Sequence, residues 1–259
     1  MSAAPASARA PLPLRLLRIV RLAAHLGAGL FTVTVRFPRW NERRRNIAIR
    51  RWSRRLLQLV NLRLHLEGRP VSWPTNCLLV LNHVSWLDIF LVDALRPARF
   101  VAKSDIAGWP LVGTLVTRAG TLYIDRGSRK AARETNALIA RAMQAGALVA
   151  CFPEGTTSHG ASVGRFHGAL FQPAIDAGAT VVPVLLRYTD RQGRSTQDCC
   201  YVGEDSLLAS VWRIVSARAH SAELRFLAPM DAAGHDRRGL AQEAHAALSM
   251  SLAKTLSGN

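Results

Sequence analysis

Acidic residues are scarce at the start of this sequence. The first 60 residues contain thirteen arginines, no lysine and a single carboxylate, Glu42. This quarter of the chain carries +12 of the formal net charge of +17, and the other 199 residues contribute only +5. Acidic residues of this segment are too few to neutralise its arginines. The imbalance predicts a partner that carries phosphates, either nucleic acid or lipid headgroups.

Cysteine is also sparse, and its spacing excludes the common metal sites. The four cysteines are Cys77, Cys151, Cys199 and Cys200, and they form no CxxC pair and no Cys/His ligand pattern. Zinc is therefore disfavoured. The pattern is typical of small buried thiols in a reducing compartment.

The sequence lacks a long hydrophobic run without charges. The best candidate, Ile19–Val35, is slightly short for a spanning helix and contains Arg21, which costs about 2.5–3.5 kcal/mol at a bilayer centre. The interruption, with no clear cleavage site after it, argues against a signal peptide. Arginines flank both sides, and Trp40 and Trp52 suit the headgroup level. We expect a helix or helix pair lying in or dipping into an anionic leaflet; a single span and a soluble basic tail are alternatives.

From about residue 76, short β-rich runs alternate with helical stretches. Near-continuous apolar strands joined by helical crossovers predict an α/β fold with a mainly parallel central sheet flanked by helices. The expected strands are Cys77–Leu81, Arg99–Ala102, Thr121–Ile124, Leu148–Phe152 and Val181–Leu186, with two more near Cys200–Val202 and Glu223–Phe226. The expected helices are Trp86–Ala94, Leu111–Arg118, Arg129–Ala145, Ala169–Ala177 and Leu240–Leu256.

A change in composition divides the chain near Gly68–Pro74, the stretch GRPVSWP. Proline and glycine at this density are typical of a connection rather than of a helix or strand. We therefore expect two parts. Residues 1–70 form a basic N-terminal membrane-associated helical arm, and residues 71–259 form an α/β catalytic domain.

The stretch LNHVSWLDIF places His83 and Asp88 five residues apart, just where an apolar strand ends. On one continuous helix their side chains would point about 140° apart, so they meet only if a turn separates them. In a structural interpretation, Ser85 caps the next helix and Asp88 is its first-turn carboxylate. In a functional interpretation, Asp88 orients the imidazole of His83, which removes a proton from a hydroxyl nucleophile. This stretch alone leaves both interpretations open.

Polar groups follow further strands. The run TLYIDR ends a probable strand with Asp125 and Arg126, and FPEGT ends another with Glu154 and Gly155. In VVPV, Pro183 falls inside an apparent strand, where it should mark an edge, a bulge or a strand end. In a parallel sheet these strand ends share one rim, where ligands usually bind.

NHVSWLD, GTLYIDR, FPEGT and VVPV, in this order and spacing, resemble the four sequence blocks of the glycerolipid acyltransferases, and most of all the bacterial 1-acylglycerol-3-phosphate acyltransferases. The resemblance covers about residues 76–190. It implies that His83 is the general base and that Asp88 orients it. The implied reaction moves a fatty acyl group from acyl-CoA or acyl-carrier protein to the sn-2 hydroxyl of 1-acylglycerol 3-phosphate, making phosphatidic acid. It implies no acyl-enzyme, no metal and no cofactor beyond the thioester co-substrate.

The resemblance also implies a substrate-binding set. Arg126 would help to hold the acceptor phosphate, and Glu154, Gly155 and Thr156 would shape the acceptor site. Lys103 lies where related sequences often carry a basic residue and is a further candidate. The implied partners are anionic membrane lipids, a lysophospholipid acceptor and the acyl donor, with no nucleic acid. The implied location is the cytoplasmic face of the inner membrane, in a monotopic or single-pass arrangement.

One departure from the family pattern affects the acceptor. The third block commonly continues as FPEGTR, but Thr157 follows here. Arg165 could supply the missing charge, and a flexible loop arginine is the simpler interpretation. The FPEGTTS form also resembles lyso-ornithine lipid acyltransferases, so another lysolipid such as lyso-ornithine lipid is the alternative acceptor.

Two other function classes compete. The stretch GASVG matches the G-x-S-x-G pattern of serine hydrolases, but no strand immediately precedes Ser162, as a nucleophile elbow requires. A nucleic-acid or anionic-membrane binding protein would explain the arginines of the N-terminal quarter. It would leave the four blocks unexplained.

Overall fold

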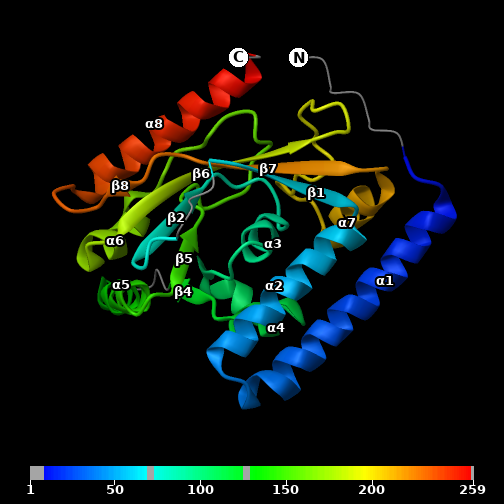
Figure 1. The fold of residues 1–259 in the computed structure, drawn as a ribbon, viewed down its shortest axis with the longest axis horizontal. Coiled ribbons are helices and arrows are strands. Elements are labelled where there is room, and N and C mark those ends of the chain that lie inside the picture. The colour runs from blue at the N-terminus through cyan, green and yellow to red at the C-terminus, as the bar shows by residue number, and fades with distance from the viewer. Residues whose placement is uncertain (1–8, 69–72, 125–128, 258–259) are drawn as a thin grey trace.

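The computed structural model describes residues 9–68, 73–124 and 129–257. Within them, an eight-stranded sheet has the order β1-β7-β6-β2-β5-β3-β4, and β8 pairs with the start of β6 (Figure 1). Strand β6 runs antiparallel to β7 and β8, and every other neighbouring pair is parallel. The expected α/β fold with a mainly parallel sheet is confirmed.

The bounds of the elements are as follows. The strands are β1 Leu62–Glu67, β2 Cys77–Leu81, β3 Arg99–Lys103, β4 Leu122–Ile124, β5 Leu148–Cys151, β6 Thr180–Thr189, β7 His220–Phe226 and β8 Met230–Asp231. The helices are α1 Leu12–Phe31, α2 Glu42–Leu59, α3 Asp88–Asp93, α4 Val112–Ala119, α5 Arg129–Gln144, α6 Gln172–Ala177, α7 Leu207–Ser216 and α8 Arg237–Leu256. A π-helical turn, Thr32–Arg36, and a 3₁₀ turn, Phe37–Arg39, continue α1.

Alternate side chains of the central strand β2 enter two separate hydrophobic cores. Leu79 packs in a cluster that includes Leu56 of α2 and Leu91 of α3. Leu78 packs on the opposite face with Met143 of α5 and residues of α8. Successive side chains of a strand point to opposite faces, so a strand covered on both sides must be apolar throughout, as CLLVL is. Burying each of these leucines stabilises the fold by about 1.5–3 kcal/mol.

Pro183 occupies the interior of β6 rather than the edge, bulge or strand end that was expected. On one side of this strand, Val181 pairs with β8 and Val184 pairs with β7. Pro183 lies between the two, and its carbonyl accepts from the N–H of Leu227. The N–H and C=O of one strand residue point to the same side of the strand. The missing N–H of Pro183 would therefore point toward the gap between β8 and β7, where β6 changes its pairing partner. The ladder therefore loses no hydrogen bond at this position.

The strand expected near Cys200–Val202 is wrong. These residues form part of the loop between β6 and α7, where the N–H of Tyr201 donates to the carbonyl of Val84 at 2.9 Å. Cys200 and the preceding Cys199 are buried. The run is apolar because it packs against the first core, while its backbone bonds to another loop instead of a strand.

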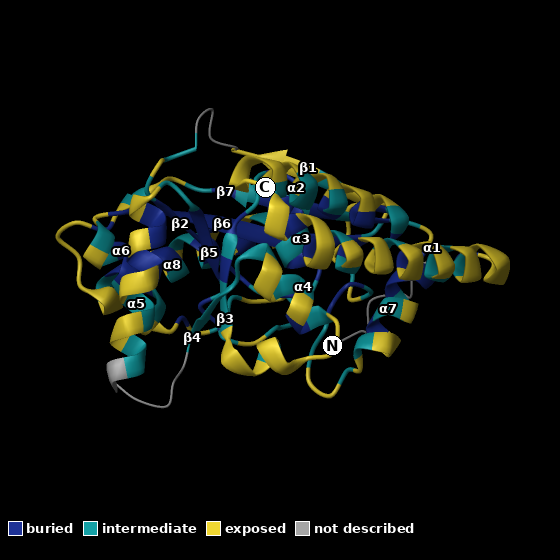
Figure 2. Cartoon of the chain, turned by 90° about the horizontal axis from the view of Figure 1, so that it is seen from below, coloured by how far each residue is buried: buried dark blue, intermediate teal, exposed yellow. Residues whose placement is uncertain are grey.

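The N-terminal segment forms a helical hairpin against the domain. Helix α1 and its continuation, Leu12–Arg39, form one helix long and apolar enough to cross a membrane, with a mean hydropathy of 1.5 in its best window, of which 17% is buried. Arg18 donates to the carbonyls of Val215, in the last turn of α7, and of Ala217, just after the helix, at 2.8 and 2.7 Å. His25 and Trp52 of α2 stack at 4.6 Å. Figure 2 shows exposed residues along much of the length of α1.

The basic segment contributes more than helices. Strand β1, Leu62–Glu67, was not anticipated, and it pairs in parallel with β7 at one edge of the sheet. The expected division between residues 1–70 and 71–259 stays a prediction, because its boundary falls among residues 69–72, outside the described ones. What the structure adds is that part of residues 1–70 belongs to the sheet.

The buried carboxyl of Asp93, at the end of α3, should make stability depend on pH. Burial raises the pKa of Asp93 from 3.8 to about 7, and the N–H of Ala98, 3.0 Å from Oδ1, opposes the rise. The folded state thus binds this proton more tightly, so the stabilisation is complete below the unfolded pKa and is lost as pH rises towards 7. The difference corresponds to about 4 kcal/mol.

We therefore expect Asp93→Asn, which keeps the acceptor and cannot ionise, to raise Tm at pH 8 by about 10 °C and to leave Tm at pH 4 nearly unchanged. Thermal melts between pH 4 and 8 measure this. Asp176→Asn, at an exposed carboxyl of α6, is the matched control and should melt like the wild type at each pH. Equal Tm gains at both ends of the range would contradict the assignment.

Candidate active site

The turn between β2 and α3 brings His83 and Asp88 together. Nδ1 of His83 lies 2.7 Å from Oδ2 of Asp88. The same oxygen accepts from the backbone N–H of Val84 at 2.8 Å and of Ser85 at 3.0 Å. The carboxylate therefore organises the turn and contacts the imidazole at once. The expected cap by Ser85 is wrong, because the N-cap of α3 is Leu87 and it has no side-chain cap hydrogen bond. Helix α3 begins at Asp88, and the hydroxyl of Ser85 accepts from the N–H of Leu87 at 3.2 Å.

Burial and hydrogen bonding decide what each partner can do. The side chain of Asp88 is fully buried, and that of His83 is 20% exposed. An ionised carboxylate only accepts hydrogen bonds, so Nδ1 carries the proton and Nε2 presents the lone pair. The imidazole stacks on the ring of Phe152 at 3.9 Å and 11°, which fixes the plane of the ring. Nε2 is thus the atom that can receive a proton from a substrate hydroxyl.

Glu154 of the FPEGT stretch braces the backbone of the site. Its Oε1 accepts from the N–H of His83 at 2.9 Å, and its Oε2 accepts from the N–H of Gly164 at 3.0 Å. The residue is 7% exposed, and burial raises the pKa of Glu154 against the opposing effect of these two donors. A Cβ at Gly164 would lie 2.6 Å from Oε2, so a larger residue there would displace the carboxylate. Glu154 was expected to shape the acceptor site, and the structure places it beneath His83.

The residues that follow Glu154 form a loop against the histidine turn. Gly155 has a φ of +70°, which glycine adopts without strain. Thr156 is exposed. The hydroxyl of Thr157 donates to the carbonyl of Tyr201, and the N–H of Ser158 donates to the carbonyl of His83 at 2.8 Å. Thr157, at the position where the family pattern commonly has arginine, therefore ties this loop to the loop before α7.

Of the two expected cationic side chains, the described residues include Lys103. Lys103 is exposed at the end of β3, where it pairs in register with Ile124 of β4. Arg126 lies outside the described residues, two positions beyond Ile124. Because β2, β3, β4 and β5 are parallel, their carboxyl ends share the rim that carries His83 and Glu154.

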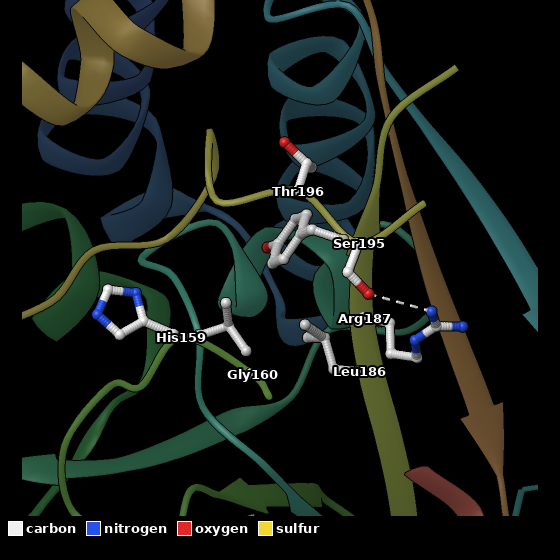
Figure 3. Close-up of a pocket in the computed structure, with 8 residues that line it drawn as sticks. His159, Gly160, Leu186, Arg187, Ser195 and Thr196 are labelled. Carbon is white, nitrogen blue, oxygen red and sulfur yellow. Dashed lines mark hydrogen bonds between the residues drawn. The ribbon is translucent and has the colours of Figure 1, made fainter. Parts of the chain in front are cut away.

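A water-sized pocket adjoins the carboxylate side of the dyad. Val84 and Tyr188, which both donate to Asp88, belong to its lining. Figure 3 shows Ser195 and Arg187, whose hydrogen bond of 3.3 Å closes one side of this pocket. The pocket is too small for a lipid. Neither His83 nor Asp88 is among the residues that line it.

The serine hydrolase interpretation has no structural support. Ser162 is exposed in the loop between β5 and the 3₁₀ turn Gly168–Phe171, and neither a strand before it nor a helix after it makes an elbow. All four cysteines are buried free thiols. Within the described residues, no group of three or more His, Cys, Asp or Glu side chains could hold a metal ion.

Comparison with known proteins identifies the family. A family model described as Acyltransferase matches residues 63–187. The chain is 38% identical, over 228 residues, to the 1-acyl-sn-glycerol-3-phosphate acyltransferase of Neisseria meningitidis serogroup B, covering 86% of this chain and 87% of that protein. The chain belongs to the acyltransferase family. The resemblance seen in the four sequence blocks is confirmed.

Other relatives of this acyltransferase carry a second name. It is 36% identical, over 226 residues, to the lyso-ornithine lipid O-acyltransferase of Pseudomonas aeruginosa, covering 87% of this chain and 82% of that protein. Its fold matches the crystal structure of the 1-acyl-sn-glycerophosphate (LPA) acyltransferase PlsC from Thermotoga maritima, with a TM-score of 0.68 at 20% identity over 95% and 98% of the two chains. The structural match independently supports the fold.

Several contacts of the site were not found from the sequence. The hydroxyl of Tyr188, on β6, donates to Oδ1 of Asp88 at 2.7 Å. Gly164 and Phe152 contact Glu154 and His83 as described above. Tyr188 lies two residues after Leu186 and five after Pro183, so strand periodicity places it on the face of Val184 and Leu186. That signal gives the face of the sheet but not the partner.

Proposed function

We propose that this acyltransferase moves a fatty acyl group from acyl-CoA or acyl-carrier protein to the sn-2 hydroxyl of 1-acylglycerol 3-phosphate, making phosphatidic acid. The observation that carries the proposal is the His83–Asp88 contact of 2.7 Å, with Asp88 buried and His83 partly exposed. The name of the 38% identical relative supports the choice of acceptor. No covalent intermediate on the protein is required by this arrangement.

The proposed reaction is a direct transfer. Nε2 of His83 removes the proton of the acceptor hydroxyl while the oxygen attacks the carbonyl carbon of the thioester. Asp88 stabilises the imidazolium that forms. The tetrahedral intermediate then collapses, the carbon–sulfur bond breaks, and the leaving thiolate takes the proton from the imidazolium. One ester and one free thiol result, and the imidazole is restored.

Charge at the rim supports the binding of a phosphate-bearing acceptor. We assign Lys103 and Arg126 to the acceptor phosphate, and Gly155 and Thr156 to the wall of the acceptor site beside His83. Glu154 holds that wall in place through its two backbone contacts. These roles extend the family resemblance to single residues of this chain.

Lyso-ornithine lipid is the second candidate acceptor. It is favoured by the 36% identical relative of that name and by Thr157, whose hydroxyl bonds to the carbonyl of Tyr201 and adds no charge to the site. Both acceptors present a hydroxyl to the same base, and they differ in the headgroup that the rim must recognise.

An acceptor panel decides between the two. Purified enzyme in detergent is given 1-acylglycerol 3-phosphate or lyso-ornithine lipid, each with acyl-CoA and with acyl-carrier protein, and kcat/KM is measured for every pair. The proposal expects phosphatidic acid as the main product. It also expects Arg126→Ala to raise KM for the phosphate-bearing acceptor more than for lyso-ornithine lipid. A higher kcat/KM for lyso-ornithine lipid would make that lipid the preferred acceptor. The absence of acyl transfer to any lysolipid would refute both candidates.

We further propose that the arm seats the enzyme on an anionic membrane, at the cytoplasmic face, without crossing it. Arg18 and His25 face the protein, where they bond to backbone carbonyls at the end of α7 and within α2. A helix tied to the protein through these two side chains is not surrounded by lipid on every side. Its outer side carries exposed apolar side chains, among them Leu12, Leu16, Leu17, Val20 and Phe31.

Vesicle sedimentation tests this seat. We expect the enzyme to bind vesicles of phosphatidylglycerol and phosphatidylethanolamine, to bind neutral vesicles less, and to lose binding as salt is raised. Glutamine at four exposed arginines of α2 should weaken anionic binding by several-fold: Arg43, Arg44, Arg50 and Arg51. Glutamine at four exposed arginines elsewhere is the control: Arg133, Arg141, Arg237 and Arg238. Equal losses from both sets would contradict the proposed seat.

A further inference from the structure

We propose that Tyr188 is a positioning residue of the reaction: it holds Asp88 in the orientation that His83 requires and sets the pH range in which His83 works as a base. The inference rests on the proposed acyl transfer, because the hydrogen bond from Tyr188 to Asp88 affects the reaction only if His83 is the base. It concerns a side chain that lies outside the four sequence blocks. Tyr188 contacts Asp88 and is assigned no contact with substrate.

The two oxygens of Asp88 are used for different tasks. Oδ2 accepts from Nδ1 of His83 and from the N–H groups of Val84 and Ser85. Oδ1 accepts from the hydroxyl of Tyr188 at 2.7 Å, and within the described part of the chain the phenol is the one donor to it. Rotation of the carboxylate would break this contact. The phenol therefore keeps Oδ2, and not Oδ1, directed at the imidazole.

Strand β6 holds the histidine turn at two points two residues apart. The side chain of Asn82 bonds twice to the backbone of Leu186. Its Nδ2 donates to the carbonyl of Leu186 at 3.0 Å, and its Oδ1 accepts from the N–H of Leu186 at 2.8 Å. Tyr188, next on the same face of the strand, bonds to Asp88 at the other end of the turn. The backbone of Tyr188 pairs with Ala222 of β7, so the phenol projects from the middle of the sheet. The turn that carries His83 is thus clamped at its first and last residues.

The protonation states around Asp88 favour a neutral phenol as donor. Burial first, and then the charge of Asp88, raise the pKa of Tyr188 well above its ordinary value. The buried thiols of Cys199 and Cys200 also face Asp88 electrostatically, and burial raises their pKa values too, to about 11 for Cys200, so they stay neutral. Glu154 acts on both His83 and Asp88. It is unchanged by a substitution at Tyr188.

The phenol takes up part of the negative charge that Asp88 would otherwise direct at the imidazole. Without this hydrogen bond the carboxylate holds the imidazolium proton more strongly. His83 would then need a higher pH to become the neutral base. A loss of packing alone would lower stability and would leave this pH dependence where it was.

The test is Tyr188→Phe, which keeps the ring and removes only the hydroxyl. We expect kcat to fall about tenfold, KM for both substrates to stay within twofold, and the acid limb of the kcat/KM profile to move to higher pH. Tyr123→Phe is the matched control, because it removes a phenol that bonds to Thr117 at 2.6 Å on edge strand β4. That variant should keep the wild-type limb. A folded Tyr188→Phe enzyme with an unmoved acid limb would overturn the proposal.

A second measurement separates this inference from the proposed function. In protein labelled with ¹⁵N-histidine, the resonance of His83 is assigned by its absence in His83→Ala, and its titration is followed in the wild type and in Tyr188→Phe. If Tyr188 acts as proposed, the midpoint of the His83 titration rises in the variant even when no substrate turns over. An unchanged midpoint overturns the proposed role of Tyr188, whatever the activity. A wild-type enzyme that is inactive on every lysolipid refutes only the proposed reaction.

Discussion

His83→Ala is expected to lower kcat for acyl transfer by about 10³-fold, within the range of 10²–10⁴ that a general base contributes. The substitution removes the only group of the dyad that can take the hydroxyl proton, while Asp88 keeps its contacts with Val84, Ser85 and Tyr188. The turn should therefore stay folded. The measurement is steady-state transfer with purified variant, together with a thermal melt.

The matched control for that variant is His65→Ala, at an exposed position of β1, which should keep wild-type kcat. Asp88→Asn is expected to lose activity as well, because its amide reverses one of the contacts that orient the imidazole. Near-normal transfer by His83→Ala, after host enzyme has been excluded with a strain lacking its own acyltransferase, would falsify the base assignment.

Glu154→Ala is expected to produce the second large effect, on both stability and rate. Removal of the carboxylate leaves the partly buried N–H groups of His83 and Gly164 without an acceptor, and a buried group of this kind costs about 1–3 kcal/mol. We therefore expect a loss of about 2–4 kcal/mol in the free energy of unfolding. We also expect kcat to fall in the folded variant, because the backbone that carries His83 loses its support.

Urea unfolding measures the stability, and kcat at low temperature, where the variant is folded, measures the second effect. Glu154→Gln keeps one carbonyl oxygen but directs an amide NH₂ at the other backbone donor, so it should lie between the wild type and Glu154→Ala. Glu204→Ala, at an exposed carboxylate before α7, is the control and should match the wild type. A Glu154→Ala protein with wild-type stability would show that the brace has no energetic role.

Local patterns were sufficient to predict the end of the sheet that carries His83 and Asp88. Apolar runs such as CLLVL and LVAC are strands because both faces of the central sheet are covered, and that need is visible in the residues themselves. The geometry of His83 and Asp88 could be anticipated for a similar reason. A turn is the one arrangement that lets side chains five residues apart meet, and the turn is built by backbone donors to Asp88.

Contacts between distant parts of the chain could not be predicted in this way. The run LRLHLE of β1 alternates like a half-buried strand, but its partner β7 begins at His220, and nothing in either segment names the other. The donor to Oδ1 of Asp88 was missed because Tyr188 is 100 residues away in sequence. Pro183 was misjudged because its neighbours β7 and β8 divide between them one side of β6. Each of these depends on tertiary pairing rather than on local propensity.

The parallel β1–β7 pair has a consequence for how the protein is made. The two strands are paired although Leu62 and His220 are separated by most of the chain. A ribosome therefore releases α1 and α2 long before β7 exists, and the N-terminal helices can meet a bilayer while the rest is still being translated. Closure of the sheet edge must wait for the last quarter of synthesis. Until then, β1 has no partner strand at that edge.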